Sequence, residues 1–239
     1  RRQRQMCIRD RPTPAEIAYW GGYFFYHNRL HRNYQDDISL HYYLLASKDG
    51  ITIGKRYFKH ENNKEDYPFS PSGHNLYDNN SKLYYCRDFD NIVYQIHEDS
   101  VVPRFRINLP NPLPASMIEE RPNEMSLLRS GYSLGITDIY EYGGLLFFRF
   151  VKDGYIWSCL YNVEESKQVY CAKRIKFLDS SLIDTIDGIY KDCFYSILTP
   201  EYLDYAFSEN PLEDYPDLFK TYDVEGDNPV IAFYRAVVR

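Results

Sequence analysis

The residues Gly131, Ser133 and Gly135 satisfy the G-x-S-x-G pattern of a serine-hydrolase nucleophile elbow. Such an elbow needs a strand before the serine, a helix after it, and a catalytic histidine later in the chain. Here the sequence predicts a helix at 123–129 before the serine and a strand at 136–142 after it, and all six histidines come earlier. We therefore interpret Ser133 as part of a glycine-flanked turn that leads into a strand.

His27 and His31 are four residues apart, a spacing that suits a metal ion only when both side chains share a helix face. They lie in and just after an aromatic run typical of a strand, so we interpret them as surface or hydrogen-bonded histidines. Paired carboxylates could act in acid–base chemistry or bind calcium, but no D-x-D-x-D-G loop is present and acidic loops are usually solvated. The sequence therefore predicts no metal and no cofactor. The acidic pairs are Asp36 with Asp37, Glu119 with Glu120, and Asp184 with Asp187.

Cys159 and Cys171 are placed symmetrically about residue 165, inside a predicted turn at 164–167. A regular hairpin therefore puts the two residues opposite each other. In an oxidising compartment they could form a cross-strand disulfide, and otherwise both would be small buried hydrophobic residues. No two cysteines have the C-x-x-C spacing of a zinc or redox site.

Residues 1–10 back-translate codon for codon into a string that resembles a transposase sequencing adaptor, and its two remaining bases allow Arg11. We predict that residues 1–11 are an adaptor-derived artefact and that the true N-terminus lies upstream. The alternative is a genuine basic arm for nucleic acid or membrane. Without the five Arg and one Asp of this segment, 23 basic and 33 acidic residues remain, so the net charge changes from −6 to −10. This balance argues against a nucleic-acid partner.

The remaining residues, 12–239, show short apolar and aromatic runs separated by turn signals about every 8 to 12 residues, a pattern typical of all-β folds. Asp49-Gly50 and Gly143-Gly144 mark hairpins. The second and third groups of runs each predict four antiparallel strands, which is the blade size of a β-propeller. The candidate strands are 19–27, 40–47 and 51–58, then 75–77, 83–86, 92–97 and 102–109, then 134–142, 145–151, 155–163 and 168–177.

The blades predicted in this way are part of one at 17–58, full blades at 73–109 and 132–178, and the beginning of another from 186. About four blades is few for a propeller, so we expect upstream blades to be missing and residues 12–239 to be a partial domain. Short helical insertions accompany them. These are a helix opened by a capping box of Ser116 with Glu119, the helix at 123–129, and a helix at 201–207 before a closing strand at 229–238.

The segment Asp90-Asn91-Ile92-Val93-Tyr94-Gln95-Ile96, followed by 102–107, resembles the bacterial six-bladed β-propeller family of NHL/TolB-like envelope lipoproteins. Members carry a "D-x-I-Y-x-I … P-x-Y-x-I-D-F" strand pair. Leu113-Pro114 with a short helix and the strand beginning Asn228-Pro229-Val230 also fit. Val93 before Tyr94, and Asn108-Leu109 in place of Asp-Phe, depart from the pattern. The resemblance implies a six-bladed propeller, truncated here, in a periplasmic or lipid-anchored protein of the cell envelope.

The resemblance also implies a binding rather than a catalytic role, and it supplies no catalytic residues. The expected partner is a small molecule, a glycan or a protein, with membrane contact only through a missing N-terminal lipid anchor. The alternative is a propeller-based glycan hydrolase or lyase with acidic and Tyr residues in its central funnel. Arg104, Arg106 and Arg149 are the polar groups predicted near a binding site, although cross-strand charge pairing is another use for each. Most of the 25 Tyr are expected to pack between blades.

Overall fold

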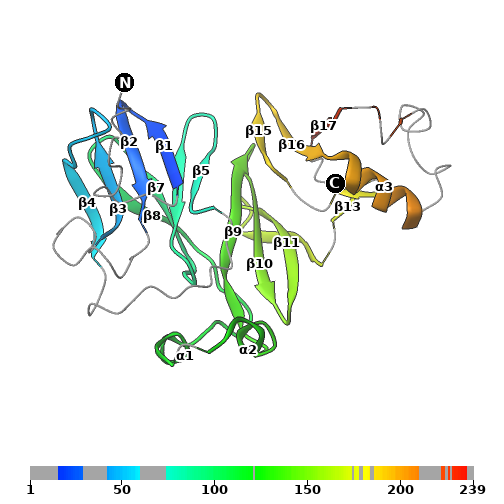
Figure 1. Ribbon diagram of the computed structural model, residues 1–239, viewed down its shortest axis with the longest axis horizontal. Coiled ribbons are helices and arrows are strands. Elements are labelled where there is room, and N and C mark those ends of the chain that lie inside the picture. Colours follow the sequence, from blue (N-terminus) through cyan, green and yellow to red (C-terminus); the bar gives the residue numbers. More distant parts are fainter. Residues whose placement is uncertain are drawn as a thin grey trace, which may run out of the picture.

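The computed structural model describes residues 16–28, 42–59, 74–120, 122–173, 175–177, 180–183, 186–209, 222–223, 226 and 228–235. These residues form antiparallel sheets that follow one another along the chain (Figure 1). Each of the first three sheets is a four-stranded meander, in which neighbours in sequence are neighbours in the sheet. This repeated arrangement is that of β-propeller blades, as predicted.

The strands of the three complete blades are rich in Tyr, Phe, Leu, Ile and Val, residues that fit a pleated, buried surface. Blade 1 comprises β1 (Glu16–Trp20), β2 (Tyr23–His27), β3 (Tyr42–Ser47) and β4 (Lys55–Lys59). Blade 2 comprises β5 (Leu76–Asp78), β6 (Leu83–Cys86), β7 (Ile92–Ile96) and β8 (Val101–Arg106). Blade 3 comprises β9 (Ser133–Tyr142), β10 (Leu145–Lys152), β11 (Tyr155–Asn162) and β12 (Lys167–Ala172).

Blade 1 is complete, whereas the sequence predicted only part of a blade there. The run 19–27, expected to be one strand, is two strands joined at Gly21 and Gly22, whose φ angles are 54° and 78°. Two successive positive φ angles make the tight turn that a twisted hairpin needs, and glycine adopts them without steric cost. The run 51–58 becomes a strand only at Lys55, because the Asp49 carboxylate accepts the backbone N–H groups of Ile51 (2.8 Å) and Thr52 (2.7 Å).

Blade 4 follows with three strands in the order β15 (Gly188–Tyr190), β16 (Cys193–Leu198) and β17 (Val230–Tyr234). The run 168–177, expected to be one strand, divides into β12 and a short strand β13 (Ile175–Phe177), which pairs with β14 (Ser180–Ile183). Helix α3 (Pro200–Glu209) begins after Thr199, close to the predicted 201–207, and packs Leu203 and Ala206 against β16 and β17.

Two short helices lie between blades 2 and 3. Helix α2 (Glu124–Leu128) begins as predicted, with the Asn123 side chain accepting the N–H of Ser126 at 2.9 Å. The predicted capping box is wrong: helix α1 (Ala115–Glu119) has Pro114 at its N-cap, no side-chain cap, and Ser116 already inside it. An N-cap residue does not need a backbone N–H, which proline lacks, so Pro114 is tolerated there and the helix starts two residues earlier than a Ser116 cap would allow. No helix in the described part of the chain is long and apolar enough to cross a membrane.

The blades meet along their first strands and share two main cores. Strand β5 contacts both β1 and β9, and β9 contacts β15, so these four inner strands lie side by side in chain order (Figure 1). One core lies between blades 1 and 2, and a larger one joins blades 2, 3 and 4. Five Tyr side chains are buried in these cores, fewer than the predicted majority, and Tyr19, Tyr155 and Tyr190 are instead exposed. The buried ones are Tyr77, Tyr84, Tyr85, Tyr94 and Tyr140.

The two ends of the inner strands differ. A meander puts its first-to-second and third-to-fourth turns at one end, which we call the tight-turn end. Asn80 of one such turn donates to the backbone oxygen of Lys191 in another at 3.3 Å, which confirms that the turns of different blades gather there. The tight-turn end consists of 21–22, 48–54, 79–82, 97–100, 143–144, 163–166 and 191–192.

The opposite end holds the second-to-third connections and the crossings between blades, and we call it the long-connection end. Among the described residues it contains the short turn 153–154 and the longer connections 87–91 and 107–132, the last of which includes α1 and α2. Binding residues often lie on loops that a rigid scaffold holds in position. We therefore look for a binding site at the long-connection end.

Candidate functional site

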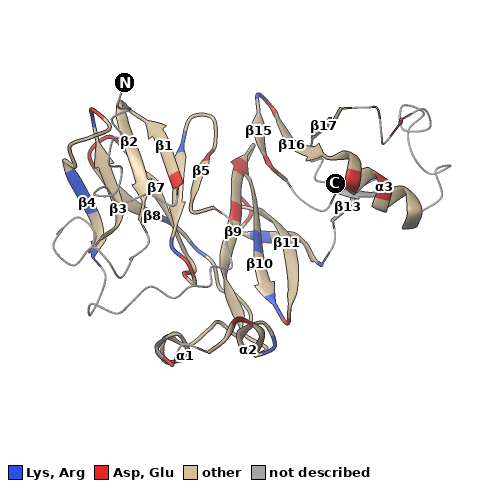
Figure 2. Ribbon diagram, viewed as in Figure 1, with Lys and Arg blue, Asp and Glu red and all other residues tan. Residues whose placement is uncertain are grey.

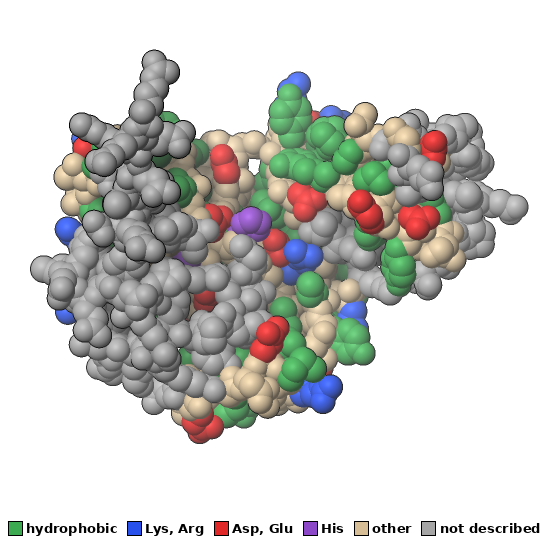
Figure 3. Space-filling model, viewed as in Figure 1, with side chains coloured by type: hydrophobic (Ala, Val, Ile, Leu, Met, Phe, Trp, Pro, Cys, Tyr) green, Lys and Arg blue, Asp and Glu red, His purple; other side chains and the backbone are tan. Residues whose placement is uncertain are grey.

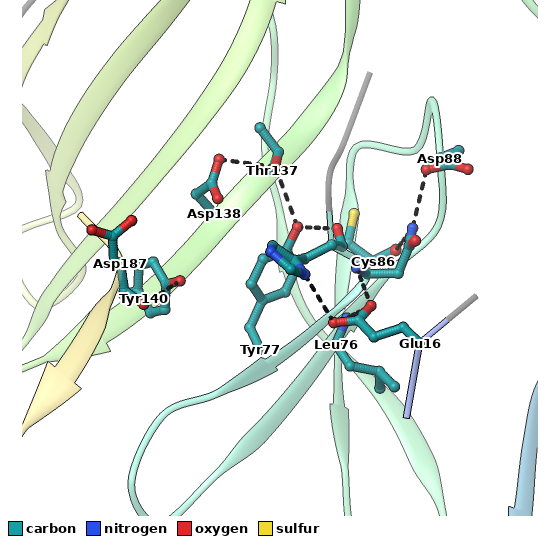
Figure 4. Close-up of polar contacts among 11 residues, drawn as sticks. Glu16, Leu76, Tyr77, Cys86, Asp88, Thr137, Asp138, Tyr140 and Asp187 are labelled. Atoms are coloured by element: carbon teal, nitrogen blue, oxygen red, sulfur yellow. Dashed lines mark hydrogen bonds and ion pairs between the residues drawn. The ribbon is translucent and has the colours of Figure 1, made fainter. Parts of the chain in front are cut away.

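Polar side chains line the inner strands near the long-connection end, where apolar residues would be expected in a closed core. We call this group the axial polar cluster. It consists of Glu16 of β1, His74 just before β5, Tyr77 of β5, Thr137 and Asp138 of β9, and Arg149 of β10. Figure 4 shows Glu16 of β1, Tyr77 of β5, and Thr137 and Asp138 of β9 near one another in the middle of the view, with Asp187 and Asp88 at its two sides.

Glu16 joins blade 1 to blade 2. Its Oε2 accepts the backbone N–H groups of Asn75 at 2.6 Å and Leu76 at 3.0 Å, just where β5 begins (Figure 4). His74 lies beside the same carboxylate, with Nδ1 3.4 Å from Oε1, and its side chain is mostly exposed. The glutamate therefore satisfies backbone donors that have no partner within their own blade.

Tyr77 joins blade 2 to blade 3. Its hydroxyl donates to the backbone oxygen of His74 and lies 3.3 Å from the hydroxyl of Thr137. Thr137 in turn donates to Oδ2 of Asp138 at 2.9 Å. The Arg149 guanidinium completes the chain, because its Nε and Nη2 each lie 2.7 Å from that same oxygen.

Asp138 owes its position to a β-bulge. Tyr140 pairs with Phe147 and Thr137 pairs with Arg149, so two residues of β9 stand opposite one residue of β10. Asp138 has a φ of 53°, a left-handed conformation that Asp tolerates better than most residues. The bulge turns the Asp138 carboxylate toward Arg149 in the neighbouring strand.

Gly135 holds β9 close to the second blade in the same region. Its φ is 101°, and a Cβ at this position would lie 2.8 Å from the backbone Cα of Phe89, in the connection 87–91. Only glycine permits this approach, because the obstacle is backbone that cannot rotate away. The connection 87–91 therefore packs closely against β9 just before the bulge.

The polar row continues toward blade 4 through Tyr140 and Asp187 (Figure 4). The Tyr140 hydroxyl donates to the backbone oxygen of Asp187 at 3.0 Å, and burial raises the pKa of this phenol well above its usual value. The Asp187 carboxylate accepts the N–H of Ile197 at 2.6 Å. Each inner strand of the described blades thus has a polar link to the next one.

A second charged group lies three residues further along β9, toward the tight-turn end. We call Glu141 with Lys82, Tyr84 and Arg104 the Glu141 cluster. Lys82 Nζ lies 2.8 Å from Oε2 and Arg104 Nη2 lies 3.2 Å from Oε1, while the Tyr84 hydroxyl donates to Oε2. Burial opposes the charge of Glu141, but the hydrogen bonds from Lys82 and Tyr84 and the two cations outweigh it and lower the pKa of the carboxyl group.

The charges are unevenly distributed over the inner surface. Asp138 and Glu141 lie on β9 and Arg149 lies on β10, in the middle of the arc of blades (Figure 2). The space-filling view shows acidic, basic and His side chains gathered between blades 2 and 3 on this side, whereas green apolar side chains dominate blade 4 (Figure 3). Within the axial polar cluster, the His74 side chain is 66% exposed, whereas those of Asp138 and Arg149 are 11% and 18% exposed.

The three arginines predicted near a site have different surroundings. Arg149 belongs to the axial polar cluster and pairs with Asp138 of the neighbouring strand. Arg104 belongs to the Glu141 cluster and joins blade 2 to blade 3. Arg106, at the end of β8, forms no ion pair with any residue that the structure describes. The structure does not gather these residues into one site, and the role of each in binding stays a prediction.

Ser133 and His27, two other predicted candidates, are buried. Ser133 opens β9 after helix α2 and donates to the backbone oxygen of Pro110, so helix, turn and strand follow the order expected of a structural turn. His27 ends β2 and its Nδ1 lies 3.1 Å from the Tyr85 hydroxyl, as expected for a hydrogen-bonded histidine. Residues 1–11 and the side chains of His31, Asp36, Asp37, Glu119 and Asp184 lie outside the described part of the chain.

Cys159 and Cys171 stand opposite each other in β11 and β12, in the register that the sequence symmetry predicted. The structure joins their sulfur atoms in a disulfide. Within the described residues, no group of three or more His, Cys, Asp or Glu side chains is placed to hold a metal ion.

Sequence reasoning missed Glu16, Tyr77, Thr137, Asp138 and Glu141. One signal was present: Thr137, Asp138 and Glu141 interrupt an otherwise apolar run in 134–142, and a polar residue inside a buried strand needs a partner. The partners themselves come from other blades, about 60 residues away in the case of Tyr77 and Thr137. Such pairs follow from the packing of blades and have no local pattern.

Comparisons with known proteins agree with this architecture. Residues 17–181 match a family model described as 6-bladed beta-propeller. A crystal structure from Bacteroides fragilis NCTC 9343, named "Putative exported protein", superposes with a TM-score of 0.69 at 14% sequence identity. The superposition covers 92% of this chain and 64% of that chain, so this chain spans less than two thirds of the structure's length. No curated protein sequence matches.

Proposed function

Because the chain belongs to the 6-bladed beta-propeller family, we propose that it is part of a ligand-binding module of an exported propeller, with its ligand at the axial polar cluster. The observation that carries this proposal is the location of the cluster. It extends over β1, β5, β9 and β10, from the long-connection end to the middle of β9, and a few convergent polar groups are what orient a bound ligand. In a closed ring these strands surround the central channel.

The contacts of the carboxylates support binding rather than catalysis. Glu16 accepts two backbone N–H groups, Asp187 accepts one, and Asp138 is paired with Arg149. A glycosidase of the common type instead needs two carboxyl groups that face each other across the bond to be cleaved, one of them protonated. In the described cluster each carboxylate has a structural partner, so the arrangement fits recognition better than proton transfer.

The proposed ligand is a small molecule, a glycan or a protein segment, and the proposed location is the cell envelope. The name of the Bacteroides fragilis structure and the resemblance of 90–107 to NHL/TolB-like envelope lipoproteins support this location. Fractionation of the native cells tests it. We expect the protein in the envelope fraction, released by detergent if a lipid anchors it, and a signal confined to the cytoplasm would contradict the proposal.

We also propose that residues 12–239 are part of a larger ring. Apolar side chains are exposed on blade 3, such as Tyr155 and Ile156, and also on both outermost blades of the described structure: Ile17 and Tyr19 on β1, and Ile197, Ile231 and Phe233 on blade 4. These are the kinds of residue that are buried between the inner blades, and the chain spans only 64% of the similar structure. The dye ANS should bind the chain alone more strongly than the whole protein. Equal fluorescence would contradict the larger ring.

A binding screen that recovers the ligand tests the main proposal. The purified protein is titrated with panels of oligosaccharides, peptides and small metabolites by calorimetry, and each ligand that binds is recovered and weighed by mass spectrometry. We expect saturable binding of an unchanged ligand, weakened by His74→Ala in the axial polar cluster. His97→Ala, an exposed histidine at the tight-turn end, is the matched control and should bind as the native protein does. A ligand recovered as cleaved fragments would contradict the proposal.

A further inference from the structure

Asp138 and Arg149 form an ion pair that leaves half of its hydrogen-bonding capacity unused. Nε and Nη2 of Arg149 and the hydroxyl of Thr137 all bond to one oxygen, Oδ2 of Asp138. Among the described residues, no group bonds to Oδ1 of Asp138 or to Nη1 of Arg149. The two side chains are only 11% and 18% exposed, but neither Oδ1 nor Nη1 is among the fully buried atoms that lack a hydrogen-bond partner, so both atoms keep some access to water.

A β-bulge in β9 holds the Asp138–Arg149 pair in place. Asp138 lies in the bulge of β9 with a positive φ, a conformation that costs free energy in an otherwise regular strand. A second feature, the close approach of the 87–91 connection to Gly135, anchors the strand just before the bulge. Oδ1 and Nη1, an acceptor and a donor with no bond to another described residue, are therefore both held by a rigid sheet, which is how precise binding sites are built.

The chemistry of the free edge restricts the ligand. An anion would face the Asp138 carboxylate, and a cation would face the Arg149 guanidinium. A neutral group must therefore donate to Oδ1 and accept from Nη1 at adjacent positions. The N–H and C=O of one trans peptide unit point in opposite directions and cannot both reach one edge. Two neighbouring hydroxyl groups can, because each hydroxyl is both a donor and an acceptor.

We propose that Asp138 and Arg149 bind a pair of neighbouring hydroxyl groups of a carbohydrate. This inference rests on the proposed function and names the ligand class for the same cluster. Asp138 Oδ1 accepts from one hydroxyl, and Arg149 Nη1 donates to the next. Thr137, on the same strand as Asp138, donates to Oδ2 of the pair, and its own hydroxyl lies 3.3 Å from that of Tyr77 in blade 2.

Two conservative variants test the assignment on the purified protein, with an array of neutral oligosaccharides as the probe. Asp138→Asn keeps one acceptor and tolerates a positive φ, and Arg149→Lys keeps the positive charge but loses the planar fork. Calorimetry with the strongest array ligand should show binding weakened about tenfold or more in each variant, since hydrogen bonds to charged groups contribute this much. The same sugar with one hydroxyl of the pair O-methylated should bind the native protein equally weakly.

Glu141→Gln is the matched control, because it also removes a charge from β9 that pairs with an arginine, three residues away. It should leave saccharide binding unchanged. Saccharide binding that survives both Asp138→Asn and Arg149→Lys but is lost in His74→Ala would overturn this inference and leave the proposed function intact. Binding of peptides at the cluster with no saccharide bound would do the same. Absence of any ligand at the cluster would overturn both.

Discussion

Strand β9 carries two acidic side chains with different surroundings: Glu141 pairs with the neighbouring blade, and Asp138 pairs within its own blade. Glu141, near the tight-turn end, meets Lys82, Tyr84 and Arg104, so both of its oxygens have partners. Asp138, toward the long-connection end, has Arg149 and Thr137 on a single oxygen and leaves the other unbonded within the described structure. Both residues are largely buried and both lie at a blade boundary, so burial alone does not distinguish them.

The difference indicates two uses for a buried charge. A carboxylate whose two oxygens both bond to the neighbouring blade fixes the position of that blade. Its oxygens are then occupied by protein donors and are not available to a ligand. A carboxylate held by a bulge and left half satisfied retains capacity for binding. The turns around Glu141 are also short and the connections around Asp138 are long, which is consistent with a structural end and a binding end of the same sheet.

The largest effect is expected from Gly135→Ala, which breaks the fit between the long-connection end and β9. The added Cβ would lie 2.8 Å from the Phe89 backbone at a φ of 101°, so the strand or the 87–91 connection must shift. We expect a loss of about 3 kcal/mol or more in the free energy of unfolding, measured by urea denaturation. Gly143→Ala, in a turn with nothing within 4 Å, is the control and should cost about 1 kcal/mol. Equal losses would show that the close approach is unimportant.

The next effect concerns the covalent link of the same blade. Cys171→Ala removes a cross-link that spans 12 residues, and such a loop contributes about 2–3 kcal/mol. The free energy of unfolding should fall by this amount, while Cys193→Ala, at a free cysteine, should have little effect. Mass spectrometry of the native protein with and without reductant provides the direct check, and two free thiols at 159 and 171 would exclude the disulfide.

Glu141→Gln should lower the stability of the protein and leave ligand binding unchanged. This result would separate the Glu141 cluster from the axial polar cluster. The substitution leaves Lys82 and Arg104 without their anion, but these cations are about one third exposed, so water replaces part of what is lost. We expect a loss of about 1–2 kcal/mol in the free energy of unfolding and an unchanged affinity for ligand. A weakened affinity together with full stability would reverse the roles assigned to the two clusters.

The smallest effect is a pH dependence. The folded-state pKa of Glu141 is lower than its unfolded value, so the unfolded state binds the proton more tightly. The resulting stability is fully present above the unfolded pKa, near the ordinary value of 4.5, and is lost as the pH falls through the lower folded pKa. Urea midpoints measured from pH 6 down to about pH 3, across the ordinary range of a glutamate carboxyl group, should fall less steeply in Glu141→Gln than in the native protein. Parallel curves would show that Glu141 does not contribute.

Much of the fold could be predicted from turn chemistry. Gly143-Gly144 and the four-residue turn between Cys159 and Cys171 set the register of blade 3, and both were readable because a hairpin is a local structure. Errors occurred where a side chain redirected the backbone. Asp49 accepts the backbone N–H groups of Ile51 and Thr52, so the strand predicted from 51 begins later. Gly21-Gly22 forms a turn inside an apolar run, where no polar residue marks it.

The candidate site was less predictable, because its residues meet only after the blades pack. Arg149 could be named as a polar residue in a buried strand, but its partner depends on a bulge that displaces Asp138 by one position. Strict alternation along β9 would have placed Asp138 and Arg149 differently. Glu16 has no signal in its own strand, since the N–H groups it accepts belong to Asn75 and Leu76, about 60 residues later.

Hydrogen–deuterium exchange with and without the strongest saccharide ligand tests the assignment of the binding end most directly. We expect slower exchange in 133–139 of β9, which contains Asp138, and in the 87–91 connection that packs against Gly135. Exchange in the turns 79–82 and 97–100, at the tight-turn end, should be unchanged. Protection confined to those turns, with 133–139 unaffected, would contradict binding at the axial polar cluster. The ligand would then lie beside the Glu141 cluster.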